Sequence, residues 1–213
     1  MPSNPVLADR AYQALRDAIV RGEFRPNQRL VESEVCESIG IGRTPVRGAL
    51  QMLEDQGMLV KQRQSWTVRE FSAADIRDVY ETRMALEGYA ARLAAHRAGD
   101  AELAAVMAVL DEHAHLELLP PEEQVTLNST FHDAIARASG NDHLIRLIGR
   151  NRQFSFDFNA ARRWSIEDYR AGHQEHRDIA EALLRRDADG VEDLVREHYR
   201  VAMEAFVSQL GRP

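Results

Sequence analysis

Three histidines in the second half of the chain fall on the apolar faces of predicted helices: His132, His176 and His198. A turn is expected near Asp187, which is 11 residues from both His176 and His198. If the two helices fold antiparallel there, both rings lie at one level, about 16 Å from the turn. Asn128 lies one helical turn before His132. Neutral imidazoles on separate helices suit zinc, nickel, copper or iron, so the pattern predicts a metal site.

The remaining histidines are weaker candidates for metal ligands. His173 lies three residues before His176 and is its main competitor. Four more are expected at the surface or at helix ends: His96, His113, His115 and His143. The alternative for every inward histidine is that it is a hydrogen-bonded residue of an ordinary core.

Two further polar side chains lie on apolar helix faces and could contact a small ligand. Arg83 needs a partner, because burying an unpaired charge is costly. That partner is either Glu87 at the i+4 position or the carboxylate of a ligand, which the guanidinium fork fits well. Asn151 is the second candidate ligand contact, and its alternative is a hydrogen-bonded core residue.

A separate group of polar residues near the N-terminus could contact nucleic acid. Arg43, Thr44 and Arg47 cluster at the start of a predicted helix, with Thr44 as its N-cap and Pro45 at its first position. A helix N-terminus attracts phosphate, and arginine can hydrogen-bond to the guanine edge. Gln51 could read adenine or contact the backbone.

The elements that would position these residues form a helix-turn-helix followed by a hairpin. Helices are predicted over residues 9–20, 32–39 and 44–56, and strands over 58–61 and 66–69. The third helix could enter the major groove, and Arg63 in the hairpin turn would then lie near the minor groove or phosphates. The alternative is a small bundle with a solvated arginine face.

From residue 72 onward the chain shows helical periods and no convincing strand. After a first helix capped by Ser72, helices are predicted over residues 101–118, 122–139, 143–158, 166–186 and 191–210. Short links rich in Gly, Pro and Asn separate them, as is typical of a helical bundle. The predicted fold class is therefore mainly α, with an N-terminal helix-turn-helix unit and a C-terminal all-α bundle.

Composition supports two domains with different tasks. The 213 residues carry a net charge of −7, with 44% hydrophobic and 29% charged residues. We call residues 1–70, with a net charge of +1, the head, and residues 71–213, with −8, the body. The chain shows no signal pattern, no apolar stretch long enough to span a membrane and only one cysteine, Cys36. These features favour a cytoplasmic protein without a membrane partner.

The head resembles the DNA-binding domain of the GntR family of bacterial transcription regulators, most clearly in the segment IGRTPVRGALQMLEDQGMLV. The resemblance implies a winged helix-turn-helix that binds a two-fold DNA operator through Arg43, Thr44, Arg47, Gln51 and Arg63. Gly42, Ser33 and Ser65 depart from the usual Ser, Arg and Gly of the family. These departures are expected to alter phosphate contact or the preferred operator.

The body resembles the FCD ligand-sensing domain of the FadR-like branch of this family. The resemblance runs from residue 71 to about 206 and includes the segments YETRMALEGYAARLAA, NSTFHDAIARASGN, EHRDIAEAL and VREH. In many such domains an Asp and three His hold a divalent metal beneath a small-molecule pocket. The matching positions are Asn128, His132, His176 and His198, so an uncharged amide replaces the usual carboxylate.

The sequence therefore predicts a homodimeric, metabolite-responsive transcription regulator, and not an enzyme. Its effector is expected to be a small carboxylate bound at zinc or nickel, with Arg83 and Asn151 as ligand contacts. One alternative is a regulator whose pocket holds no metal. A less favoured one is a three-histidine metalloenzyme, which leaves the head unexplained.

Overall fold

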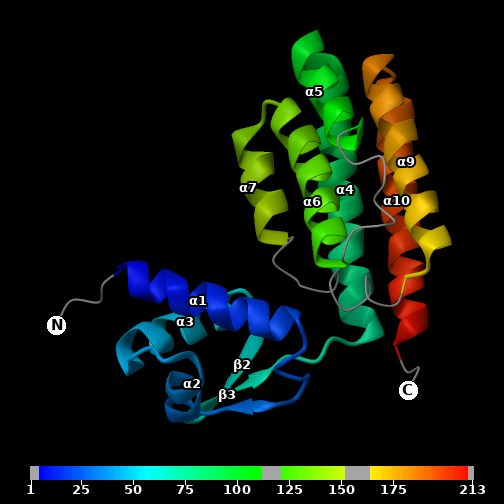
Figure 1. Cartoon of the computed structure of the whole chain (residues 1–213). Helices are drawn as coiled ribbons and strands as arrows, with labels where there is room; N and C mark the ends of the chain where they lie inside the picture. The colour runs from blue at the N-terminus through cyan, green and yellow to red at the C-terminus, as the bar shows by residue number, and fades with distance from the viewer. Residues whose placement is uncertain (1–4, 112–120, 152–163, 211–213) are drawn as a thin grey trace. The chain divides into compact units, whose positions relative to one another are not determined.

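The computed structural model describes residues 5–111, 121–151 and 164–210 (Figure 1). The chain divides into two compact units, and the division falls between Phe71 and Ser72. We describe the head and the body separately. In the described segments, no helix combines the length and apolar character that a membrane crossing requires.

The head contains three helices and a small antiparallel sheet. The helices are α1 (Pro5–Val20), α2 (Glu32–Ile39) and α3 (Arg43–Asp55), and the strands are β1 (Arg29–Leu30), β2 (Leu59–Gln62) and β3 (Ser65–Val68). Strand β3 is central, because it pairs with both β1 and β2. Helix α2 ends at Gly40, whose left-handed φ of 65° turns the chain toward α3. These elements form a helix-turn-helix with a β-wing, as predicted.

One core holds α3 against the rest of the head. Val46, Ala49, Leu50 and Leu53 of α3 are fully buried, as the helical period of the sequence predicts. They pack in a cluster with Leu15 of α1 and residues of the sheet. The opposite face of α3, which carries the candidate DNA contacts, is thereby turned to solvent.

Three local predictions for the head need correction. Thr44 is not the N-cap, because α3 begins at Arg43 after an extended Gly42. Pro45 is accordingly the third helical residue, still within the first turn, where a missing N–H costs no helical bond. The hairpin turn is shorter than predicted, since only residues 63 and 64 separate β2 from β3. Strand β1 was not predicted, because two residues are too short to show a period.

The body is a bundle of long helices. The described helices are α4 (Ala73–Arg97), α5 (Asp100–Asp111), α6 (Pro121–Ala138), α7 (Asp142–Asn151), α9 (Ile166–Leu184) and α10 (Ala188–Gln209). Helix α4 lies along α10 and also contacts α6, α7 and α9 (Figure 1). The all-helical prediction is therefore confirmed for the described residues of the body, and Ser72 forms the expected cap through a capping box with Asp75. The predicted ends of two helices, at residues 118 and 158, fall outside the described residues.

Close packing between α4 and α10 fixes how their side chains meet. A Cβ at Gly88 would lie only 3.2 Å from Cγ of Arg196, so glycine permits the close approach of the two helices there. The Tyr80 ring of α4 packs against Tyr199 and Phe206 of α10, with centroids 6.1 and 5.6 Å apart. Because α10 also carries His198, this packing sets the height of that ring beside α4.

Candidate metal centre and nucleic-acid interface

Three histidine rings from three helices converge inside the body. His132 comes from α6, His176 from α9 and His198 from α10, and all three are buried. The Nε2 atom of His198 lies 3.3 Å from Nε2 of His132 and 3.3 Å from Nε2 of His176. The expectation that His176 and His198 lie at one level is therefore confirmed. Ligand atoms of all three rings lie within 4.8 Å of one another, close enough to bind one ion.

Apolar neighbours on each helix turn the rings inward. His132 shares its face of α6 with Ile135 and Ala136, which are also buried. On the same helix, the Phe131 ring packs 4.6 Å, centroid to centroid, from the ring of His176. Helical periodicity thus selects the inward face, and ring packing holds the imidazoles in place.

Burial keeps the His176 ring in the form that a metal requires. Complete desolvation holds the pKa of His176 well below its usual value of 6.5, and the neighbouring rings of His198 and His173 act in the same direction. A neutral imidazole has a lone pair available for a metal, whereas a protonated one has none. The donor set therefore fits a divalent transition metal.

Two carboxylates approach the rings from the side opposite the centre. Oε2 of Glu175 lies 2.7 Å from Nδ1 of His198, and Oε2 of Glu87 lies 3.7 Å from Nδ1 of His132. Glu87 is buried in α4, and it accepts a hydrogen bond of 2.6 Å from the hydroxyl of Tyr199. Only the Glu175 contact has hydrogen-bond length.

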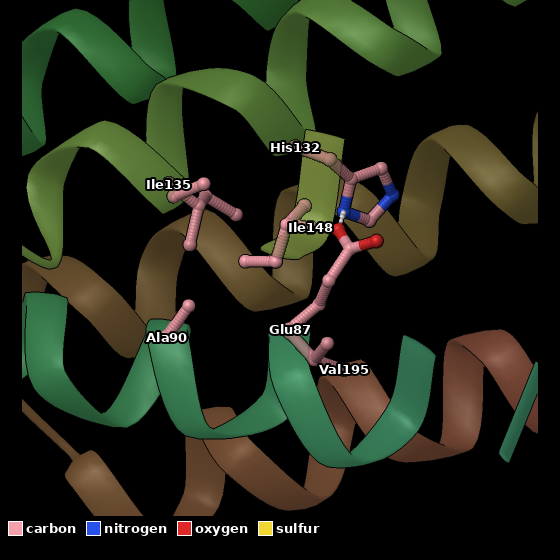
Figure 2. Close-up of a pocket in the computed structure, with 7 residues that line it drawn as sticks. Glu87, Ala90, His132, Ile135, Ile148 and Val195 are labelled. Carbon is pink, nitrogen blue, oxygen red and sulfur yellow. Dashed lines mark ion pairs between the residues drawn. The ribbon is translucent and has the colours of Figure 1, made fainter. Parts of the chain in front are cut away.

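A small pocket lies beside His132 on the Glu87 side. Figure 2 shows Glu87 directed toward His132, with Ala90, Ile135 and Ile148 nearby. The walls of the pocket are apolar apart from Glu87 and His132. Arg83 and Asn151 are not among its lining residues. The pocket has no room for a water molecule, so it is far smaller than a common small-molecule site.

The other candidate residues of the body lie on α4, α6, α7 and α9. Asn128 is half-buried on α6, one turn before His132. His173 is half-buried and is not part of the group. Arg83 is buried, with Cζ 5.0 Å from the centre of the Tyr80 ring. Asn151 ends α7, and its buried Oδ1 meets no hydrogen-bond donor among the described residues.

Two of the four histidines expected at the surface or at helix ends lie in the described residues, and both are found there. His96 lies in the last turn of α4 and His143 is an exposed residue of α7. Both are outside the converging group. His113 and His115 lie outside the described residues.

The candidate DNA contacts of α3 share one exposed face. Arg43, Thr44, Arg47 and Gln51 are all exposed, within the first three turns of the helix. Arg43 makes no hydrogen bond or ion pair within the described part of the chain. An exposed N-terminal helix face with arginines is suited to the major groove.

The side chain of Arg47 is already bound by another residue of the head, a contact that the sequence did not predict. Its Nε and Nη2 atoms donate to the two carboxylate oxygens of Glu32 on α2, at 2.9 and 3.0 Å. This hydrogen bond from Arg47 lowers the pKa of Glu32 below its usual value of 4.5. The Arg47 side chain remains 65% exposed, so it can also exchange this partner for a phosphate.

The wing carries Arg63 at its turn. Arg63 is exposed, with a left-handed φ of 53°. Ser65 is not at the tip but at the start of β3, where it is buried. Its hydroxyl accepts from Nε of Arg29 at 3.1 Å and donates to the carbonyl of Gln62 at 3.2 Å. A serine thus ties the base of this turn to β1.

A winged helix-turn-helix head joined to a helical body with a buried imidazole group is the architecture of a ligand-responsive transcription regulator. The model for gntR-family bacterial regulatory proteins matches residues 7–68, and the FCD domain model matches residues 78–201. The chain belongs to the GntR family and carries an FCD domain.

Relatives and solved structures agree with this assignment. The chain is 31% identical to the Nta operon transcriptional regulator of Aminobacter aminovorans, over 82% of each protein. It is 27% identical to the transcriptional repressor GlaR of Escherichia coli, over 88% of this chain and 90% of the relative. The fold is similar to that of E. coli McbR/YncC, with a TM-score of 0.76 at 23% identity, covering 98% of this chain and 99% of the other. This protein is a DNA-binding transcription regulator.

Proposed function

We propose that the protein is a cytoplasmic, homodimeric regulator whose DNA affinity responds to a small organic acid bound at a metal in the body. The observation that carries the proposal is the convergence of three Nε2 atoms in a buried place, with His198 at 3.3 Å from both other rings. Ring nitrogens this close together can be ligands of one ion, and imidazole is a ligand that suits zinc, nickel, copper and iron. Relatives that are transcription regulators favour a non-enzymatic role.

The proposed metal ligands are His132, His176, His198 and the side-chain oxygen of Asn128. A set of imidazoles and one amide contains no thiolate and no carboxylate, which favours zinc or nickel over magnesium, calcium or manganese. When bound, the metal supplies a positive Lewis-acidic centre to which an effector carboxylate can bind. Arg83 and Asn151 are the proposed further contacts to that effector.

The proposed DNA contacts are Arg43, Thr44, Arg47 and Gln51 in the major groove, with Arg63 of the wing at the minor groove or phosphates. Their exposure on α3 and at the wing turn supports this assignment. Two heads related by dimer symmetry would bind a two-fold operator. The acidic body is expected to be repelled by DNA, which confines contact to the heads.

Effector binding would act by shifting the population between two arrangements of the dimer. An effector that prefers one arrangement changes DNA affinity by the coupling free energy, typically about 1–3 kcal/mol or roughly 5–150-fold. The sign of this coupling decides whether the effector releases or recruits the operator.

The test combines elemental analysis with a DNA-binding assay on the purified full-length protein. We expect about one zinc or nickel ion per chain, and a salt-sensitive preference for the promoter region beside the protein's own gene over random duplex. Organic acids are then screened for a change in that preference, with His132→Ala as the metal-site variant. Wild-type protein that holds no stoichiometric metal after metal loading would contradict the metal centre and leave the metal-free regulator.

A further inference from the structure

The proposed ligands of the metal centre carry no negative charge. His132, His176 and His198 are imidazoles and Asn128 is an amide, so a divalent ion would bring two uncompensated positive charges into a buried place. Burying charge without compensation is costly, and nearby negative groups reduce the cost. Carboxylates that touch the rings are therefore the groups to consider for metal affinity.

Among the described residues, the carboxylates of Glu87 and Glu175 reach the rings, and their contacts differ in kind. Glu87 lies 3.7 Å from Nδ1 of His132, beyond hydrogen-bond length, and its Oε2 already accepts from Tyr199. Glu175 lies 2.7 Å from Nδ1 of His198, the length of a charge-assisted hydrogen bond. Of these two, Glu175 is thus the carboxylate hydrogen-bonded directly to a ring of the centre.

The Glu175 contact fixes where His198 carries its proton. An ionised carboxylate can only accept, so Nδ1 of the ring must donate. In the neutral ring, Nε2 then has no proton, and its lone pair faces Nε2 of His132 and of His176. A carboxylate bound to the far nitrogen also makes the metal-binding nitrogen more basic.

We propose that Glu175 is a positioning residue of the metal centre, which orients His198 and supplies the negative charge that the four proposed ligands lack. This inference rests on the proposed metal centre. Helix α9 then contributes twice: its His176 ring as a ligand, and the preceding residue as the holder of a ring on α10. The hydrogen bond between Glu175 and His198 thus also links α9 to α10 beside the proposed metal.

The position of Glu175 makes the role testable without unfolding the body. Its side chain is 34% exposed, in contrast to the buried Glu87, so replacing it removes little core packing. Glu175→Ala removes both the acceptor and the charge. Glu175→Gln keeps an oxygen that can accept from Nδ1 but removes the charge. Glu181→Ala is the matched control, because Glu181 is an exposed carboxylate of the same helix with an ion pair to Arg185.

Full-length, metal-stripped proteins are titrated with zinc in competition with a chromophoric chelator, and with cobalt to record the visible absorption of the bound ion. We expect Glu175→Ala to bind zinc about 10–100-fold more weakly than wild type. Glu175→Gln should fall between the two, and Glu181→Ala should match wild type. The cobalt spectrum should change in Glu175→Ala and not in the control, which a general loss of stability would not produce.

The outcomes separate this inference from the metal centre itself. Wild-type protein that binds zinc while both Glu175 variants bind it as tightly as Glu181→Ala would overturn the role of Glu175 and leave the centre intact. Wild-type protein that binds neither zinc nor cobalt would overturn both. If Glu175→Ala does not fold, Glu175→Gln decides by the same comparison, because it preserves the shape of the side chain.

Discussion

The ion pair between Glu32 and Arg47 predicts that a carboxylate on α2 restrains an arginine of the recognition helix. The pair is bidentate, at 2.9 and 3.0 Å, and neutralises the guanidinium on the face proposed to contact DNA. Glu32→Gln removes the charged partner and leaves Arg47 in place. The freed guanidinium should then bind a phosphate of any duplex, whatever its sequence.

The expected magnitude follows from counterion release. Each additional phosphate contact steepens the dependence of log K on log salt by about 0.9 on duplex DNA. Between about 50 and 200 mM salt, one extra contact therefore adds about a 3.5-fold fall in affinity for random duplex. At the lower salt concentration the variant should bind random duplex more tightly than wild type.

The assay is fluorescence anisotropy with a random-sequence duplex over a series of salt concentrations. Glu34→Gln is the control, because it removes the same charge from an exposed position of α2. The steeper slope should disappear in the double variant Glu32→Gln/Arg47→Ala, since the guanidinium responsible is then absent. Equal slopes for Glu32→Gln and Glu34→Gln would refute the reasoning, because the effect would then be one of net charge alone.

Four further predictions concern the body. Tyr199→Phe removes the 2.6 Å hydrogen bond to the buried carboxylate of Glu87 and should lower the free energy of unfolding by about 1.5–3 kcal/mol, measured by urea denaturation. In metal-free protein, the lowered pKa of His176 means that the unfolded chain takes up a proton on this ring that the folded state does not. The free energy of unfolding should therefore decrease as the pH falls below 6.5. This decrease should be smaller in His176→Asn, and in the exposed control His143→Asn it should be the same as in wild type. Removing metal with a chelator should lower the melting temperature of wild type. Asn128→Asp should bind zinc more tightly than wild type, because it adds a charged ligand. Equal zinc affinity of Asn128→Asp and wild type would argue against Asn128 as a ligand.

The sequence alone predicted where most helices lie, to within a few residues at their ends, and which face of α3 is buried. Helix α2 spans the predicted residues, and Ser72 caps α4 as predicted. Helical periodicity put His132, His176 and His198 on inward faces because it depends only on neighbours along one helix. The spacing of two of them from Asp187 also gave their common level, since a tight antiparallel turn leaves no other register.

Contacts between elements were decided by the tertiary structure. Glu32 and Arg47 are 15 residues apart, and Tyr199 and Glu87 are 112 apart, so neither pair leaves a periodic signal in the sequence. Glu175 lies directly before His176 in the sequence, yet it is hydrogen-bonded to His198. This contact depends on how α9 packs against α10. Hydrogen-bond partners across helices are set by interhelical distance and rotamer, which periodicity does not encode. The helical periodicity of the sequence therefore predicts the faces on which the histidines and arginines lie, whereas tertiary packing determines which carboxylates they contact.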